Sequence, residues 1–233
     1  MRLTTHPGRA LIFLLVAIMT MLPGMTAAQG TPVATPGSPE QQQAVWERLD
    51  GVAQVVMRTW GDVLEGTPVP GEAPAQRFVA GLIAEFETEE QAASALDPIR
   101  DWMVASLQVN LVDVDLTAEA AEIDDRGDRS MALTATGTTR DMPLTISVVL
   151  VQDGDRVLAV GGSVMDEQDL LPLLEGIVDA MLEREPGGEE SRDNVGRFSG
   201  GLWDIFPDQD AEVLDGMRRQ GDLPIYQGGT SAD

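Results

Sequence analysis

The sequence predicts an α+β fold with a mostly antiparallel sheet of about five strands and helices on one face, preceded by an amphipathic helix. Two observations indicate this class. Short apolar or alternating segments follow one another between residues 111 and 163, and helical patterns flank them on both sides. Because the 233-residue chain is 43% hydrophobic and contains no cysteine, its stability must come from a packed core.

Residues 1–28 have the layout of a secretory signal peptide. A basic start is followed by an apolar run over residues 10–22 and by small residues up to Ala28, so we expect cleavage between Ala28 and Gln29. This apolar run is shorter than the roughly 17–25 residues that a bilayer crossing needs, which favours cleavage over a retained anchor. The expected product is secreted or otherwise extracytoplasmic, without an integral membrane span.

Two segments with different patterns follow the expected cleavage site. Residues 29–40 are rich in Pro and Thr, which is typical of a flexible or polyproline-like linker. From Val45 to Trp60, apolar side chains recur at steps of three and four residues, which predicts an amphipathic helix over residues 41–60. This helix is the first element of a single α+β domain expected over residues 41–185.

The first strand of the sheet and its following helix are predicted over residues 77–108. Alternation from Phe78 to Phe86 indicates a strand. Thr88 and Gln91 have the spacing of a capping box, in which the two side chains bond to backbone donors at a helix start. Pro98 predicts a break into a second helical stretch.

Four further strand candidates are separated by turns, and a helix closes the domain. The candidates cover residues 111–116, 131–137, 144–151 and 156–163. The last two are joined through Asp153-Gly154, a strong hairpin signal because glycine accepts the positive φ of the turn. Asp166 can cap a final helix with an apolar stripe from Leu170 to Met181.

The C-terminal part contains a Gly/Glu-rich linker over residues 186–197 and an aromatic tail over residues 198–233. A short helix is expected in the tail, because the acidic start after Pro207 and the arginines at 218 and 219 suit the helix dipole. The tail either folds back onto the domain or recognises a protein or cell-envelope partner. Folding back is favoured, since exposed apolar patches are uncommon on monomers. Its candidate interaction residues are Phe198, Trp203, Phe206 and Tyr226.

Charge and composition exclude several functions. The formal net charge of −24 repels phosphate backbones, so we expect no nucleic-acid partner. All 15 basic residues are arginines, and the one histidine, His6, lies in the expected signal peptide. The mature chain therefore lacks the bases of nucleophile–base triads and the His and Cys ligands of zinc sites. No cofactor is expected.

Carboxylates are the remaining candidates for chemistry. Asp113 and Asp115 would lie on one face of a strand, about 7 Å apart, near the separation used by inverting glycosidases. Asp124, Asp125 and Asp128 surround Gly127 and could bind a divalent cation weakly, although their spacing does not match an EF-hand. Strand alternation and a solvated turn explain the two patterns without chemistry, and we favour these interpretations.

A resemblance in layout supports a binding function. The signal segment, the TPVATPGSPE linker, one compact domain and an aromatic tail resemble uncharacterised exported proteins of high-GC bacteria. The β-α-β-β-β-α order is also similar to small sensor-type α+β domains, which bind and do not catalyse. We therefore expect a non-catalytic extracellular binding or interaction module. The alternatives are a carboxylate-based hydrolase of an extracellular polymer and an acidic divalent-cation-binding protein.

Overall fold

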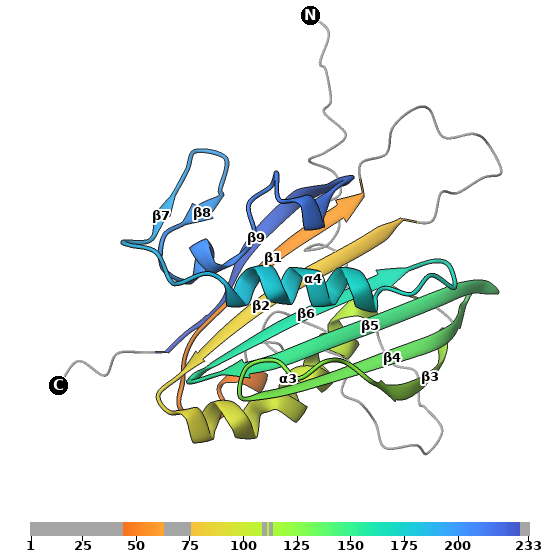
Figure 1. Ribbon diagram of the computed structural model, residues 1–233, viewed down its shortest axis with the longest axis horizontal. Helices are drawn as coiled ribbons and strands as arrows, with labels where there is room; N and C mark the ends of the chain where they lie inside the picture. Colours follow the sequence, from red (N-terminus) through yellow and green to blue (C-terminus); the bar gives the residue numbers. More distant parts are fainter. Residues whose placement is uncertain (1–43, 63–75, 109–110, 112–113, 229–233) are drawn as a thin grey trace, which may run out of the picture.

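The computed structural model describes residues 44–62, 76–108, 111 and 114–228. Their main feature is a seven-stranded sheet in the order β3-β4-β5-β6-β2-β1-β9, in which all neighbouring strands are antiparallel (Figure 1). The strands of this sheet are β1 (Val52–Asp62), β2 (Arg77–Phe86), β3 (Val114–Ala121), β4 (Arg129–Thr139), β5 (Met142–Asp153), β6 (Arg156–Val164) and β9 (Met217–Gln227). The helices α3 (Glu89–Gln108) and α4 (Leu171–Leu182) pack against it.

The predicted fold class is wrong, because the protein is broadly β-rich and its helices do not share one face. Ile177 of α4 packs in the same buried cluster as Val79, whereas Met103 of α3 packs in the cluster that contains Ala80. Val79 and Ala80 are consecutive in β2, so they point to opposite faces of the sheet. A strand buried on both faces has apolar residues throughout, and that pattern does not reveal which helix covers which face.

The helix predicted over residues 41–60 is also wrong. Residues 44–46 form one helical turn, and the chain then enters β1, which lies between β2 and β9. The four-residue step from Val56 to Trp60 is a multiple of two, so a strand places both side chains on one face just as a helix does. Gly51 has a φ of +69°, which turns the chain before the strand.

The elements predicted between residues 77 and 182 are mostly present. The Thr88 half of the predicted capping box is present, since its Oγ1 accepts a hydrogen bond from the Gln91 backbone N–H at 3.3 Å, but Gln91 Oε1 accepts from the Thr88 hydroxyl at 3.0 Å. The break at Pro98 does not occur, because α3 continues through this residue while its neighbours pack on the sheet. The β5–β6 hairpin turns at Gly154, whose φ is +60°. The final helix begins five residues after the expected cap, at Leu171.

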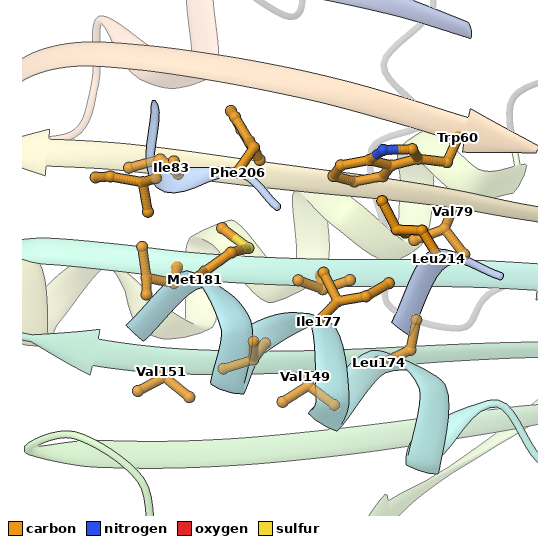
Figure 2. Packing of buried hydrophobic residues seen from close by; sticks show 14 of the residues in the cluster. Trp60, Val79, Ile83, Val149, Val151, Leu174, Ile177, Met181, Phe206 and Leu214 are labelled. Carbon is orange, nitrogen blue, oxygen red and sulfur yellow. The ribbon is translucent and has the colours of Figure 1, made fainter. Parts of the chain in front are cut away.

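The C-terminal segment contributes to both the sheet and the core. The predicted short helix is absent, because residues 212–214 form a 3-10 turn, η3 (Glu212–Leu214), and the two arginines lie in β9. β9 pairs with β1 and forms one edge of the sheet. Figure 2 shows Phe206 and Leu214 packed with Trp60 and α4 over the sheet. Gly81 permits this packing, since an added Cβ would lie 3.0 Å from Trp60 and 3.1 Å from Phe206.

The segment between α4 and this packed region forms a small hairpin. Its strands are β7 (Ser191–Arg192) and β8 (Phe198–Ser199), and they pair only with each other (Figure 1). The 3-10 helix η2 (Gly201–Ile205) follows and buries Leu202, Trp203 and Ile205. The hairpin and η2 thus lie beside the β1–β9 edge of the sheet, where a pocket is formed.

Candidate functional site

An open pocket of about 350 Å³ lies between the β1–β9 edge, η2 and the β7–β8 hairpin. We call it the arginine pocket because three of the 15 basic residues of this acidic chain line it. Its side chains come from four separate segments of the chain. The lining residues are Arg58, Arg184, Phe198, Ser199, Trp203, Asp204, Phe206, Asp208 and Arg219.

A buried carboxylate, Asp222, holds two of these arginines together. Its side chain is 0% exposed and that of Arg58 is 7% exposed. Asp222 Oδ1 accepts hydrogen bonds from Nε of Arg58 and from Nε of Arg219, each at 2.9 Å, and Oδ2 accepts one from the Phe198 backbone N–H at 2.8 Å. Arg219 also forms an ion pair with Oδ2. One negative charge thus lies between two positive charges.

An irregularity in the β1–β9 pairing makes this arrangement possible. Arg58 and Asp222 are direct cross-strand partners, but the register shifts between Thr59 and Trp60, where β9 contains an additional residue. Residues three positions apart in a regular strand point to opposite faces. The additional residue of the bulge shifts the alternation of side chains by one position, so Arg219 and Asp222 point to the same face of the sheet.

The same two arginines fix the hairpin that closes one side of the pocket. The Phe198 carbonyl oxygen accepts hydrogen bonds from Nη2 of Arg58 at 3.2 Å and from Nη2 of Arg219 at 3.1 Å. Together with the bond from its N–H to Asp222, these contacts secure both backbone polar groups of Phe198. The position of β8 therefore depends on the Arg58–Asp222–Arg219 cluster.

The two arginines of this cluster share one buried carboxylate, and burial disfavours their charged forms. Desolvation lowers the pKa of Arg58 to about 10, and attraction to Asp204 and Asp208 opposes part of this change. Desolvation, followed by repulsion from Arg58 and Arg197, lowers the pKa of Arg219 to about 10. Both groups stay protonated at neutral pH. An anion in the pocket would favour their charged forms.

Aromatic rings form the inner wall of the pocket. The Arg58 guanidinium carbon lies 4.9 Å from the centroid of the Phe206 ring and 5.8 Å from that of Trp203, which are cation–π distances. The rings of Phe198 and Trp203 stack at 4.8 Å, and Arg192 covers Phe198 at 5.0 Å. These contacts hold Arg58 in place although its charge is buried.

The rim of the pocket is polar and carries charges of both signs. Arg184 Nη2 donates to Asp208 Oδ2 at 2.8 Å, and its Nη1 donates to the Phe206 carbonyl at 3.2 Å. The hydrogen bond from Arg184 is the main cause of the lowered pKa of Asp208. Asp204 is exposed, and its Oδ1 accepts a hydrogen bond from the Gly200 N–H at 2.8 Å.

The four aromatic residues predicted for the tail have different surroundings. Trp203 and Phe206 are each 1% exposed and belong to the core, while Phe198 is half-buried and lines the pocket beside them. Tyr226 is half-buried and packs in the cluster on the other face of the sheet. The packing supports the interpretation that the tail folds back onto the domain.

Only one of the two carboxylates considered for hydrolysis lies in the described residues. Asp115 is exposed in β3, whereas Asp113 lies outside the described residues. The proposed pairing of these two carboxylates therefore remains a prediction. Ala28 and Gln29, the expected cleavage site, also lie outside the described residues, as does the expected linker over residues 29–40.

The acidic residues predicted for cation binding have other roles in the structure. Asp124, Asp125 and Asp128 are exposed, and Asp128 Oδ2 accepts a hydrogen bond from the Gly154 N–H in the β5–β6 turn. Arg126 lies among them and forms ion pairs with Glu175 and Asp179 of α4. Within the described ranges, no group of three or more acidic, His or Cys side chains could hold a metal ion.

Sequence reasoning did not find the arginine pocket. Arg58 is about 160 positions from its partners in β9, and only the sheet pairing brings them together. The Arg218-Arg219 pair is the available signal, but in the sequence its position suits the end of a helix.

No helix in the described part of the chain has the length and apolar character needed to span a membrane.

Comparisons with models of protein families, with curated proteins and with solved structures found no match to this chain.

Proposed function

We propose that this protein is an exported binding module that holds a small anion in the arginine pocket. The observation that carries the proposal is the buried Arg58–Asp222–Arg219 cluster, in which two positive charges share one carboxylate beside an open cavity. Guanidinium groups bind carboxylates and phosphates through several hydrogen bonds at once. Export is inferred from the layout of residues 1–28.

Binding fits this site better than hydrolysis does, because its carboxylates are engaged in structural bonds. Asp222 accepts from three donors and is inaccessible to solvent. Asp208 is paired with Arg184, and Asp204 accepts from the Gly200 backbone. Arginines thus hold two of the three carboxylates, Asp222 and Asp208, whereas hydrolysis by carboxylates needs a pair of them as acid and base or nucleophile. The pocket is therefore suited to hold a charged group.

Anions are expected to raise the melting temperature of the purified protein. A ligand at ten times its Kd stabilises the folded state by about 1.4 kcal/mol, which corresponds to a rise of roughly 3–6 °C for a chain of this size. The measurement is a thermal unfolding scan with sodium acetate, phosphate or glucuronate, compared with sodium chloride at equal ionic strength.

Two variants connect this effect to the pocket. Arg219→Gln removes the surplus charge while Asp222 keeps Arg58 as its partner, so the anion-dependent rise should disappear. Arg100→Gln is the matched control, because Arg100 also forms aspartate ion pairs, with Asp97 and Asp101, but lies in α3 on the other face of the sheet. If none of the anions raises the melting temperature, or if Arg219→Gln responds like the original protein, the proposed function is wrong.

A further inference from the structure

We infer that the arginine pocket selects ligands with a single carboxylate over ligands with a doubly charged phosphate. This inference rests on the proposed function and specifies its ligand class. It follows from the charged side chains that line the pocket and from the guanidinium nitrogens that form no hydrogen bond within the cluster.

The charges of the site favour one negative charge on the ligand. Arg58 and Arg219 share Asp222, which leaves a surplus of one positive charge. Arg184 and Asp208 form an ion pair and balance each other. Asp204 lines the same cavity and attracts Arg58, so the six charged side chains of the site balance, and the two guanidinium groups attract one added negative charge more readily than two.

A second negative charge on the ligand would be repelled. Asp204 and Asp208 line the same cavity, and the carboxylate of Asp204 is exposed there and competes with a ligand for the attraction of Arg58. The net charge of −24 adds a repulsive field over a longer range. Because Asp204 already offsets the extra positive charge of the Arg58–Asp222–Arg219 cluster, a second negative charge on the ligand is repelled, and a phosphate dianion gains less than a carboxylate does.

The hydrogen-bond donors fit a carboxylate as well. The bonds that hold the cluster together use Nε and Nη2 of both Arg58 and Arg219. These bonds leave one terminal nitrogen, Nη1, on each guanidinium group, and both side chains line the pocket. Two donors on two neighbouring groups match the two oxygens of one carboxylate.

The surroundings of these donors suit a hydroxylated ligand of modest size. The cavity of about 350 Å³ is near the lower end of the range for small-molecule sites. Ser199, Asp204 and Asp208 at its rim can bond to hydroxyl groups. A sugar acid is therefore an appropriate probe of the site.

Calorimetric titration of the purified protein with glucuronate, glucose and glucose 6-phosphate tests the inference. The three ligands share a hexose ring and differ in their charged group. At pH 7.5 we expect glucuronate to bind, glucose to give no measurable binding, and glucose 6-phosphate to bind about three- to fivefold more weakly than glucuronate, which lies within the range for one exposed like-charge contact. If glucose 6-phosphate binds as tightly as glucuronate, the inference is wrong although the anion-binding function stands. If neither charged ligand binds, the inference is wrong, and the thermal scans with acetate and phosphate decide whether the anion-binding function stands.

An exposed residue provides a second test that does not depend on the buried cluster. Asp204→Asn keeps the carbonyl oxygen that accepts from Gly200 but removes one negative charge from the rim. This variant should bind glucose 6-phosphate at least about threefold more tightly than the original protein, with a smaller change for glucuronate. Arg100→Gln should leave the affinities for both ligands unchanged. An unchanged affinity ratio in Asp204→Asn would overturn the inference.

Discussion

Asp222→Asn is expected to lower the free energy of unfolding by about 3–5 kcal/mol, the usual cost of removing one partner from a buried ion pair. The substitution preserves the shape of the side chain but leaves Arg58 and Arg219 without their shared counter-charge. It also places an amide group among three donors, so at least one of their hydrogen bonds is lost.

Urea denaturation measures this effect, since a lower midpoint at an unchanged slope reports a change in stability. Asp101→Asn is the matched control. Asp101 also accepts from an arginine, but its side chain is 59% exposed, and surface ion pairs of this kind contribute about 0–1 kcal/mol. A loss in Asp222→Asn no larger than that in Asp101→Asn would show that the Arg58–Asp222–Arg219 cluster does not stabilise the fold.

Trp203→Ala is also expected to lower the free energy of unfolding by about 3–5 kcal/mol, because it removes a buried indole from the core. Trp203 is 1% exposed and stacks on Phe198, and its ring centroid lies 6.0 Å from that of Phe206. The substitution also removes one of the two rings next to Arg58, so anion binding should weaken in the same variant.

Trp203→Phe distinguishes the packing of the ring from other effects of the substitution. The indole N–H of Trp203 is buried without a hydrogen-bond partner in the described part of the chain, so Phe loses no bond there. We expect Trp203→Phe to retain most of the stability in the same denaturation experiment. Val195→Ala, at a position 76% exposed, should change it by less than about 0.5 kcal/mol. A small loss in Trp203→Ala would contradict the placement of the tail in the core.

Local sequence signals predicted the β5–β6 hairpin and several strands correctly because those structures depend on neighbouring residues. The Asp153-Gly154 turn joins β5 and β6, and Thr88 caps α3. The failures concern long-range pairing. β1 becomes a strand because it pairs on both sides, with β2 and with β9, and this partnership overrides its helical periodicity.

The candidate site was missed for the same reason. Its cluster joins Arg58 with Arg219 and Asp222, and the β-bulge that aligns the last two has no signal in a single sequence. Trp203 and Phe206 were singled out from the sequence, but as an apolar patch or packed tail and not as the wall of a pocket for charged groups. Aromatic residues indicated where the site lies, and the sheet pairing defined its chemistry.

Hydrogen–deuterium exchange of the purified protein tests the central claim most directly, because the site exists only if the C-terminal segment is folded onto the sheet. The informative amides are those of β9 and that of Phe198, which donates to Asp222. We predict that the Phe198 amide and the β9 amides bonded to β1 are protected, although less than those of the central strand β6 because β9 forms an edge of the sheet, and that the Phe198 amide slows further with glucuronate. Rapid exchange throughout residues 198–227 in the protein without ligand would contradict the packed tail, the arginine pocket and the function proposed for it.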